Sequence, residues 1–323
     1  MTAGTLERGV RLGGGPSRYD VVVLDVRKPP RRYADEFIRL FRVARWLGSR
    51  VWPGRAAYAR SLRRGLRGET VDVPVPGLHP DADGLRLVQL SDLHAGCFLD
   101  EASLDPVIAL ASSFEPDVLC VTGDFVTRGA FEVELLGRAF ARIPAPLGKF
   151  AVFGNHDYRR RQEGAITASL RRQGVVVLRD ASALVMRGAA RVRIAGLEDI
   201  EESRKADLDA ATAAFDGSEH ARILLCHHPD IGDLLPAGRF DLVLSGHSHG
   251  GQIVLPLVGS LGRAWMPSRI GGRYPLPGGG LHYVNRGIGV MVLPFRVGAP
   301  PEVTCLVLRR APTASAPAPN SLG

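Results

Sequence analysis

The feature that most constrains the fold is a series of short apolar runs, most of which end in polar residues. The runs cover residues 85–90, 118–121, 150–153, 175–178, 191–195, 221–226, 241–245 and 302–308. Segments with helical patterning lie between the earlier ones, at 101–113, 131–141 and 161–173. Strands that alternate with helices in this way predict an α/β fold built on largely parallel sheets.

Seven side chains of metal-binding type follow these runs and scarcely occur inside them. They are Asp92, His94, Asp124, Asn155, His227, His247 and His249. Because the carboxyl ends of parallel strands meet at one edge of a sheet, residues far apart in sequence can converge there. Two carboxylates, one amide oxygen and four imidazoles suit two divalent metal ions, and manganese, iron and zinc are all compatible with such ligands.

A pair of such ions predicts hydrolysis at phosphorus. Two metals about 3.5–4 Å apart, sharing a carboxylate, can polarise a phosphoryl group and supply hydroxide near neutral pH. The charge that develops on the phosphate oxygens also calls for a proton donor and a cation. His156 and Arg128 are the candidates for these roles, although a surface salt bridge is an equal alternative for Arg128.

The same residues, taken in order, resemble the motifs of the calcineurin-like metallophosphoesterases. The matching segments are Asp92-Leu-His94, Gly123-Asp124, Gly154-Asn155-His156-Asp157, His227 and Gly246-His247-Ser-His249. The resemblance covers roughly residues 84–310. It implies a four-layer α/β/β/α sandwich and a phosphoric ester or anhydride hydrolase in which a metal-bound hydroxide attacks phosphorus.

The resemblance also implies a role for each motif residue. Asp92, His94 and His249 would bind one ion. Asn155, His227 and His247 would bind the other, with Asp124 as the bridge. His156 would protonate the leaving oxygen or stabilise the transition-state phosphate. His228, next to His227, is a less favoured alternative ligand.

One position departs from the protein-phosphatase branch of this family. In that branch a second Asp follows Gly-Asp and orients the catalytic histidine, but here Thr127 stands in its place, while Arg128 and Gly129 still match. A protein phosphatase is therefore disfavoured. Asp157 is the candidate to support His156 instead.

The last third of the chain resembles a bacterial subfamily of membrane-associated phosphodiesterases that includes UDP-2,3-diacylglucosamine pyrophosphatases. The resemblance rests on segments such as Gly250-Gly251-Gln252-Ile253 and Val284-Asn285-Arg286-Gly287. It implies a phosphodiester or a nucleotide-linked pyrophosphate as substrate, with a lipid as a further option. Apolar positions that could accept an acyl chain are Leu255, Leu257, Val258, Leu261, Trp265 and Met266. Arginines that could contact substrate phosphates are Arg269, Arg273 and Arg286.

Two other functions stay open. A non-catalytic metal-binding scaffold on the same fold would not need four imidazoles and His156. A nuclease would fit the net charge of +8 and the pI of about 9.8, because a basic protein favours anionic partners. Stacking aromatic residues do not cluster near the motifs, so we do not expect nucleic acid as a partner.

The remaining segments divide the chain into four parts. We expect a disordered N-terminus at 1–18, a basic amphipathic segment at 19–70, the metallophosphoesterase domain at 71–310 and a disordered tail at 311–323. A helix within 33–51 could pack on the domain, contact nucleic acid, or dock on an anionic membrane surface through residues 33–52.

The sequence contains little that indicates export or disulfide formation. The chain has no apolar leader, no run of about 18 apolar residues and no paired cysteines of the CxxC type among its four. We therefore expect reduced cysteines and a cytoplasmic location, with peripheral binding to the inner face of the cell membrane as an option.

Overall fold

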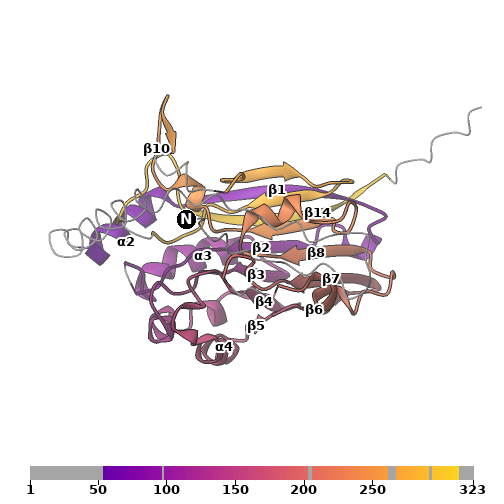
Figure 1. Cartoon of the computed structure of the whole chain (residues 1–323), viewed down its shortest axis with the longest axis horizontal. Coiled ribbons are helices and arrows are strands. Elements are labelled where there is room, and N and C mark those ends of the chain that lie inside the picture. Colours follow the sequence, from indigo (N-terminus) through magenta and orange to yellow (C-terminus); the bar gives the residue numbers. More distant parts are fainter. Residues whose placement is uncertain (1–53, 97, 203–205, 261–266, 291–292, 313–323) are drawn as a thin grey trace, which may run out of the picture.

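The structure is a computed structural model that describes residues 54–96, 98–202, 206–260, 267–290 and 293–312 (Figure 1). Its helices are α2 (Gly54–Gly65), α3 (Asp105–Ser113), α4 (Glu163–Arg172) and α5 (Leu208–Thr212). Its strands are β1 (Arg67–Pro76), β2 (Arg86–Leu90), β3 (Val118–Thr122), β4 (Lys149–Val152), β5 (Val176–Val177), β6 (Ala181–Arg187), β7 (Ala190–Gly196), β8 (Ala221–Leu225), β9 (Leu242–Ser245), β10 (Val254–Leu255), β11 (Gly259–Ser260), β12 (Gly272–Pro275), β13 (Leu281–Val284) and β14 (Glu302–Ala311).

Two six-stranded sheets form the centre of the molecule. The first has the order β1-β14-β2-β3-β4-β5, in which β2 to β5 are parallel and β14 is antiparallel to β2. The second has the order β12-β13-β9-β8-β7-β6, in which β13, β9, β8 and β7 are parallel. These parallel strands carry almost continuous apolar runs because helices or the opposite sheet cover both of their faces.

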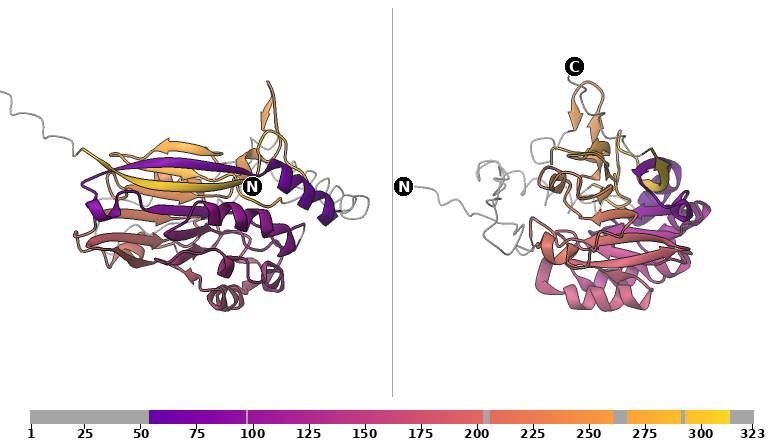
Figure 2. Two further views of the ribbon diagram at one scale, coloured as in Figure 1. Left: turned by 180° about the vertical axis from the view of Figure 1, so that it is seen from behind. Right: turned by 90° about the vertical axis from the view of Figure 1, so that its right-hand side faces the viewer.

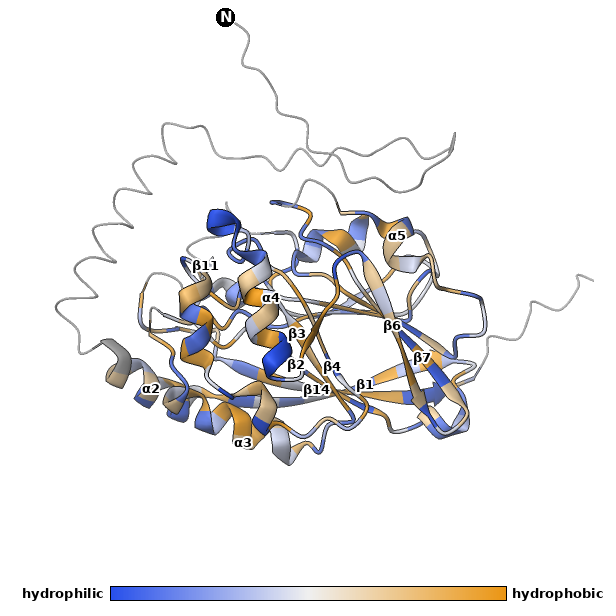
Figure 3. Ribbon diagram, turned by 90° about the horizontal axis from the view of Figure 1, so that it is seen from below, coloured by the Kyte–Doolittle hydropathy of each residue, from blue (hydrophilic) through white to orange (hydrophobic). Residues whose placement is uncertain are grey.

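Three apolar clusters separate the layers. One lies between the two sheets and includes Val73, Leu87 and Leu225. A second lies between the first sheet and helices α2, α3 and α4, and a third lies between the second sheet and α5. Figure 2 gives two further views of this arrangement, and in Figure 3 the helices α3 and α4 show both hydrophobic and hydrophilic colour, as expected for helices with one buried face. The predicted α/β/β/α sandwich is confirmed.

Most predicted strands are present, but one predicted helix is wrong. Residues 131–141 form two 3₁₀ segments, Ala130–Leu136 and Phe140–Arg142, instead of an α-helix. They are separated by Gly137, which has φ of 53° and lies so close to the carboxylate of Glu101 that a Cβ would clash with it. Strands β6, β12 and β13 were not predicted, because their sequences mix polar and apolar residues without a clear period.

The amino-terminal edge of the first sheet is formed by β1. This strand begins at Arg67 and pairs in parallel with β14. Helix α2 packs on the domain, since Tyr58 and Leu62 are buried in the helix-covered cluster. The Tyr58 hydroxyl donates to the carbonyl of Ile288.

Several predictions lie outside the described residues. The basic helix at 33–51, the N-terminal 1–18, Cys97 and nearly all of the tail belong to this group. Of the predicted tail, Ala311 is the last residue of β14. Among the described residues, Cys120, Cys226 and Cys305 are free, buried thiols, as predicted. Within the described part of the chain, no helix is both long and apolar enough to span a bilayer.

Candidate metal centre

The seven predicted ligands converge at one end of the sandwich. Asp92 and His94 follow β2, Asp124 follows β3 and Asn155 follows β4, all in the first sheet. The histidines come from the second sheet, where His227 follows β8 while His247 and His249 follow β9.

The two sheets are joined directly beneath these residues. The amide of Gln89 in β2 donates to Thr122 Oγ1 and to the carbonyl of Ser245, at 3.0 Å each, and so bridges to β9. The Nδ1 of His227 lies 2.7 Å from the carbonyl of Thr122. These contacts explain how strand ends from different sheets meet.

The ligand atoms form two groups that share Asp124. In the first, His94 Nε2 lies 3.0 Å from His249 Nε2 and 3.3 Å from Asp124 Oδ2, while His249 Nε2 lies 3.4 Å from Asp92 Oδ1. In the second, His227 Nε2 lies 3.5 Å from the same Asp124 oxygen and 3.2 Å from His247 Nδ1. Asp124 therefore sits between the groups.

This arrangement fits divalent ions better than it fits internal hydrogen bonding. The buried Oδ1 of Asn155 has no hydrogen-bond partner among the described residues. The Nε2 atoms of His94 and His249 lie 3.0 Å apart. Such unmatched acceptors are what a cation would satisfy.

The backbone at the ligands is strained. Asp92, His94, Asp124, His247 and His249 all have φ between 49° and 70°, in the left-handed region. Side chains other than glycine seldom adopt this region, at a cost of order 1–3 kcal/mol each. Left-handed residues gathered at one place indicate that the surrounding fold holds these ligands in set positions.

Burial and neighbouring charges shift the pKa values of several side chains in the centre. Burial alone would raise the pKa of Asp124, but the imidazoles of His227, His156 and His94 lower it well below its usual range. At His227 burial would lower the pKa, but the carboxylates of Asp124 and Asp92 raise it well above its usual range. Burial also raises the pKa of Asp92 and lowers that of His247 to about 4.

Affinity for Mn²⁺ should consequently rise with pH. Because the pKa of His227 is raised well above its usual range, a proton competes with the metal for this imidazole at and below neutral pH. We expect binding to tighten by about tenfold for each unit between pH 6 and 8, the change expected when one proton is displaced. Calorimetric titrations in buffers of different ionisation enthalpy measure both the affinity and the proton release. Equal affinity at pH 6 and 8 without proton release would contradict this prediction.

The three predicted catalytic residues, His156, Asp157 and Arg128, lie in different surroundings. His156 is buried beside the Asp124 carboxylate, and its backbone N–H donates to Asp124 Oδ1 at 2.9 Å. Its Nδ1 lies 3.2 Å from the carbonyl of Thr127. One partner of the His156 ring, at Nδ1, is therefore a backbone oxygen at the position that departs from the protein-phosphatase pattern.

Asp157 supports the ligand loops rather than the ring of His156. Its carboxylate accepts hydrogen bonds from the backbone N–H groups of Asp124, Phe125, Val126 and Gly154, at 2.8–3.2 Å. Four such bonds fix the loop after β3 against the loop after β4.

Arg128 lies exposed on the loop after β3. Buried Glu132 accepts the backbone N–H groups of Thr127 and Arg128, at 2.7 Å each, and holds this turn. Among the described residues no carboxylate pairs with the Arg128 guanidinium, so the alternative of a surface salt bridge lacks a partner there.

The adjacent histidines point differently. His227 faces Asp124, whereas the ring of His228 lies 4.4 Å from that of His247, and its Nδ1 accepts the backbone N–H of Asp230. His228, His247 and Glu201 form a further group with ligand atoms close together. The geometry favours His227 over His228 at the shared carboxylate.

The sequence pattern missed several residues that shape the centre. The loop 285–289 packs on the segment that carries Asp92 and His94. A Cβ at Gly287 would lie 2.6 Å from Asp92 Cβ, and a Cβ at Gly289 would lie 2.2 Å from the Leu93 carbonyl oxygen. Arg296 donates to the carbonyls of His249, Arg286 and Gly289, and ties this loop to the histidine loop.

Of the arginines suggested for substrate phosphates, two have structural partners. Arg286 pairs with buried Glu302 at 2.8 Å, and Arg269 pairs with Asp233 at 2.6 Å. Arg273 is exposed on β12. No sequence signal distinguishes these three, because the partners are distant in the chain.

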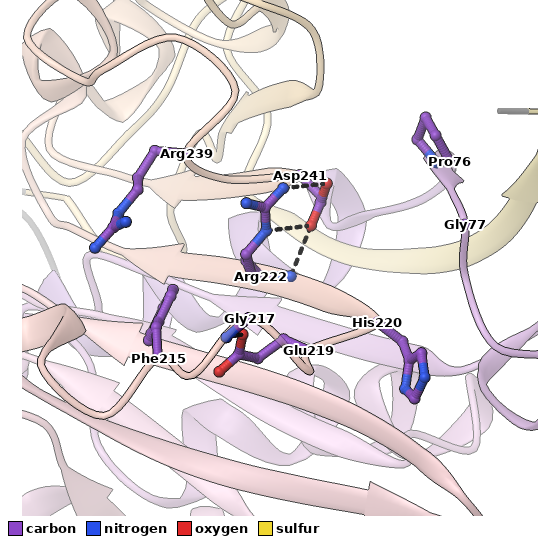
Figure 4. A pocket seen from close by; sticks show the side chains of 9 residues that line it. All are labelled: Pro76, Gly77, Phe215, Gly217, Glu219, His220, Arg222, Arg239 and Asp241. Carbon is purple, nitrogen blue, oxygen red and sulfur yellow. Dashed lines mark hydrogen bonds and ion pairs between the residues drawn. The ribbon is translucent and has the colours of Figure 1, made fainter. Parts of the chain in front are cut away.

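A cavity of about 410 Å³ lies at the opposite, amino-terminal ends of β8 and β9 (Figure 4). Its charged side chains are largely engaged, since Arg222 pairs with Asp241 at 3.4 Å and Arg239 donates to Thr212 Oγ1. We assign it no role in the chemistry at the metal centre.

Comparison with known proteins agrees with the geometry. A family model described as calcineurin-like phosphoesterase matches residues 85–251. Phosphodiesterase YaeI of Escherichia coli is 29% identical over 71% of this chain and 83% of its own length. UDP-2,3-diacylglucosamine pyrophosphatase LpxG of Chlamydia trachomatis is 31% identical over 69% of this chain and 83% of its own length.

A bovine transmembrane protein with a metallophosphoesterase domain is 30% identical over 75% of this chain, and the chain spans 57% of its length. The predicted branch of relatives is confirmed, because YaeI and LpxG are both among them. The chain belongs to the calcineurin-like phosphoesterase family of hydrolases.

Proposed function

We propose that this protein hydrolyses a phosphodiester or pyrophosphate bond at a dinuclear metal centre. The observation that carries the proposal is the convergence of ligand atoms from both sheets on the shared oxygen of Asp124. Asp92, His94 and His249 would hold one ion, and Asn155, His227 and His247 the other. Two divalent ions there would polarise the phosphoryl group and lower the pKa of bound water.

The side chains around the ligands have separate tasks in this proposal. His156, which is buried beside Asp124, would act on the phosphoryl oxygens or the leaving oxygen. Asp157 is a positioning residue, because it holds the loops that carry Asp124 and His156. Arg128 lies exposed on the adjoining loop, where it is free to contact the substrate.

The test of this function is turnover of bis(p-nitrophenyl) phosphate by the full chain loaded with Mn²⁺. Manganese-dependent release of p-nitrophenol is expected, with loss of activity on chelation. A protein that binds two metal ions per chain but releases no product would instead be a metal-binding scaffold. Cleavage of single-stranded DNA in preference to nucleotide-linked pyrophosphates would favour a nuclease.

A lipid-bearing substrate is the finer part of the proposal. The hairpin β10–β11 follows the histidine loop and projects from the body of the molecule (Figures 1 and 2). Leu257 and Val258 at its tip are strongly exposed, and exposed apolar side chains of this kind suit a lipid contact. LpxG, whose name gives a lipid-linked pyrophosphate as substrate, supports the same choice.

Binding to an anionic membrane surface on the cytoplasmic side is proposed for the residues before α2. We expect the full chain to float with vesicles containing anionic lipid, and a chain starting at Gly54 to remain unbound. This truncation keeps α2, whose Tyr58 and Leu62 are part of the core, so it removes the basic segment without exposing the apolar core. A truncation at Gly68 would also remove α2 and would therefore be a poorer test. Equal flotation of the full chain and the Gly54 form would contradict the prediction.

A further inference from the structure

Directly after the histidine of the centre, the chain makes a strained basic turn. Residues Arg159–Arg161 form one 3₁₀ turn, in which Arg160 and Arg161 have φ of 65° and 53°. Two consecutive non-glycine residues in the left-handed region are uncommon, and such strain persists only where surrounding contacts hold it. This turn is therefore built to a shape that the local sequence does not prefer.

Contacts with the neighbouring loop hold the turn in place. The Arg159 guanidinium donates from Nη1 to the carbonyl of Thr127 at 3.3 Å. Gln162, at the end of the turn, accepts the backbone N–H of Ala130 at 2.7 Å. These contacts join the loops after β3 and β4, in addition to the contacts made by Asp157.

These contacts place the Arg159 guanidinium against the ring of His156. Arg159 Nη2 lies 3.0 Å from His156 Nε2. Because a guanidinium can only donate, this Nε2 accepts, and the ring proton lies on Nδ1, which faces the Thr127 carbonyl. Arg159 is exposed, and among the described residues no carboxylate lies within ion-pair distance of it.

We propose that Arg159 binds the phosphoryl oxygens of the substrate, as the cation of the centre that the metal ligands do not supply. The inference rests on the proposed function and deepens it. Arg159 donates to His156 Nε2, and its planar guanidinium carries further N–H groups that can bind two oxygens of one phosphate. The Thr127 carbonyl holds the Arg159 guanidinium beside the ring of His156.

The experiment measures binding of inorganic phosphate to the full chain loaded with Mn²⁺. Arg159→Gln is compared with Arg171→Gln, an exposed arginine near the end of α4 whose replacement removes the same charge. Phosphate affinity is read from the rise in Tm with phosphate concentration and from competitive inhibition. We expect Arg159→Gln to weaken phosphate binding by about ten- to a hundredfold, as for a lost hydrogen bond between charged groups, while Arg171→Gln stays within about twofold.

Arg159→Lys separates charge from geometry, because it retains the cation but not the planar fork. It should bind phosphate with an affinity between those of the wild type and Arg159→Gln. Unchanged phosphate affinity in Arg159→Gln at full metal content would overturn the proposal. A fall in kcat without a change in phosphate affinity would also overturn it, because Arg159 would then only position His156. Since the Tm readout needs no turnover, it reports on Arg159 even if the proposed hydrolysis fails.

Discussion

Asp124→Asn should abolish most of the activity and one of the two metal sites. The single oxygen Oδ2 of Asp124 lies within 3.5 Å of ligand nitrogens from both groups. A neutral amide cannot compensate the charge of two cations, although it can still accept the N–H of His156 through Oδ1. We expect kcat/KM to fall by about a thousandfold or more, equivalent to about 4 kcal/mol at 1.36 kcal/mol for each tenfold change.

Two measurements check this result. Elemental analysis should find at most one tightly bound ion per chain, and phosphodiester turnover should be lost in parallel. Asp105→Asn in α3 is the matched control, because its carboxylate is half exposed and its ion-pair partner in the described part of the chain is Arg142. That control should keep both ions and full turnover. An Asp124→Asn protein that retained two ions and activity would remove the bridging role from our mechanism.

Gly154→Ala should damage both stability and activity through a single added methyl group. A Cβ at Gly154 would lie 2.3 Å from Asp124 Oδ1 and 2.6 Å from the Asp124 nitrogen. Because backbone and a buried ligand both stand in the way, the loop after β4 must move. Overpacking of this kind costs about 1–3 kcal/mol. Displacing Asn155 and His156 by about 1 Å should reduce kcat by roughly a hundredfold.

The same substitution elsewhere supplies the control. Gly164→Ala in α4 meets no atom within 4 Å, and alanine favours the helix by at most about 1 kcal/mol. Chemical denaturation of the two variants should therefore shift in opposite directions, and only Gly154→Ala should lose turnover. A Gly154→Ala protein as stable and active as the wild type would show that the ligand loops are less tightly packed than the distances indicate.

The predictions differ in what they test. Asp124→Asn changes the charge of the centre with little change in shape, whereas Gly154→Ala changes the shape of the centre and replaces none of its ligand side chains. If the first loses metal and the second keeps it with reduced kcat, then metal binding and alignment of His156 are separate contributions to the proposed reaction.

The sequence alone determined the fold class and the candidate ligands, for a local reason. Five of the seven candidate ligands come within three residues of the end of a short apolar run. An apolar run between turn residues predicts a buried strand regardless of its partners. The apolar runs by themselves are therefore enough to place Asp92, Asp124, Asn155, His227 and His247 at strand ends. The order of the motifs then pointed to one family.

Only the tertiary structure decided how these residues are held and what surrounds them. The pairing of Asp157 with backbone N–H groups, of Arg296 with three carbonyls and of Arg159 with His156 joins loops whose approach depends on packing of the whole sandwich. Residues 131–141 had a helical pattern, yet Gly137 against Glu101 overrode it. Short-range pattern specifies elements, whereas long-range contacts between loops depend on distances that no local pattern contains.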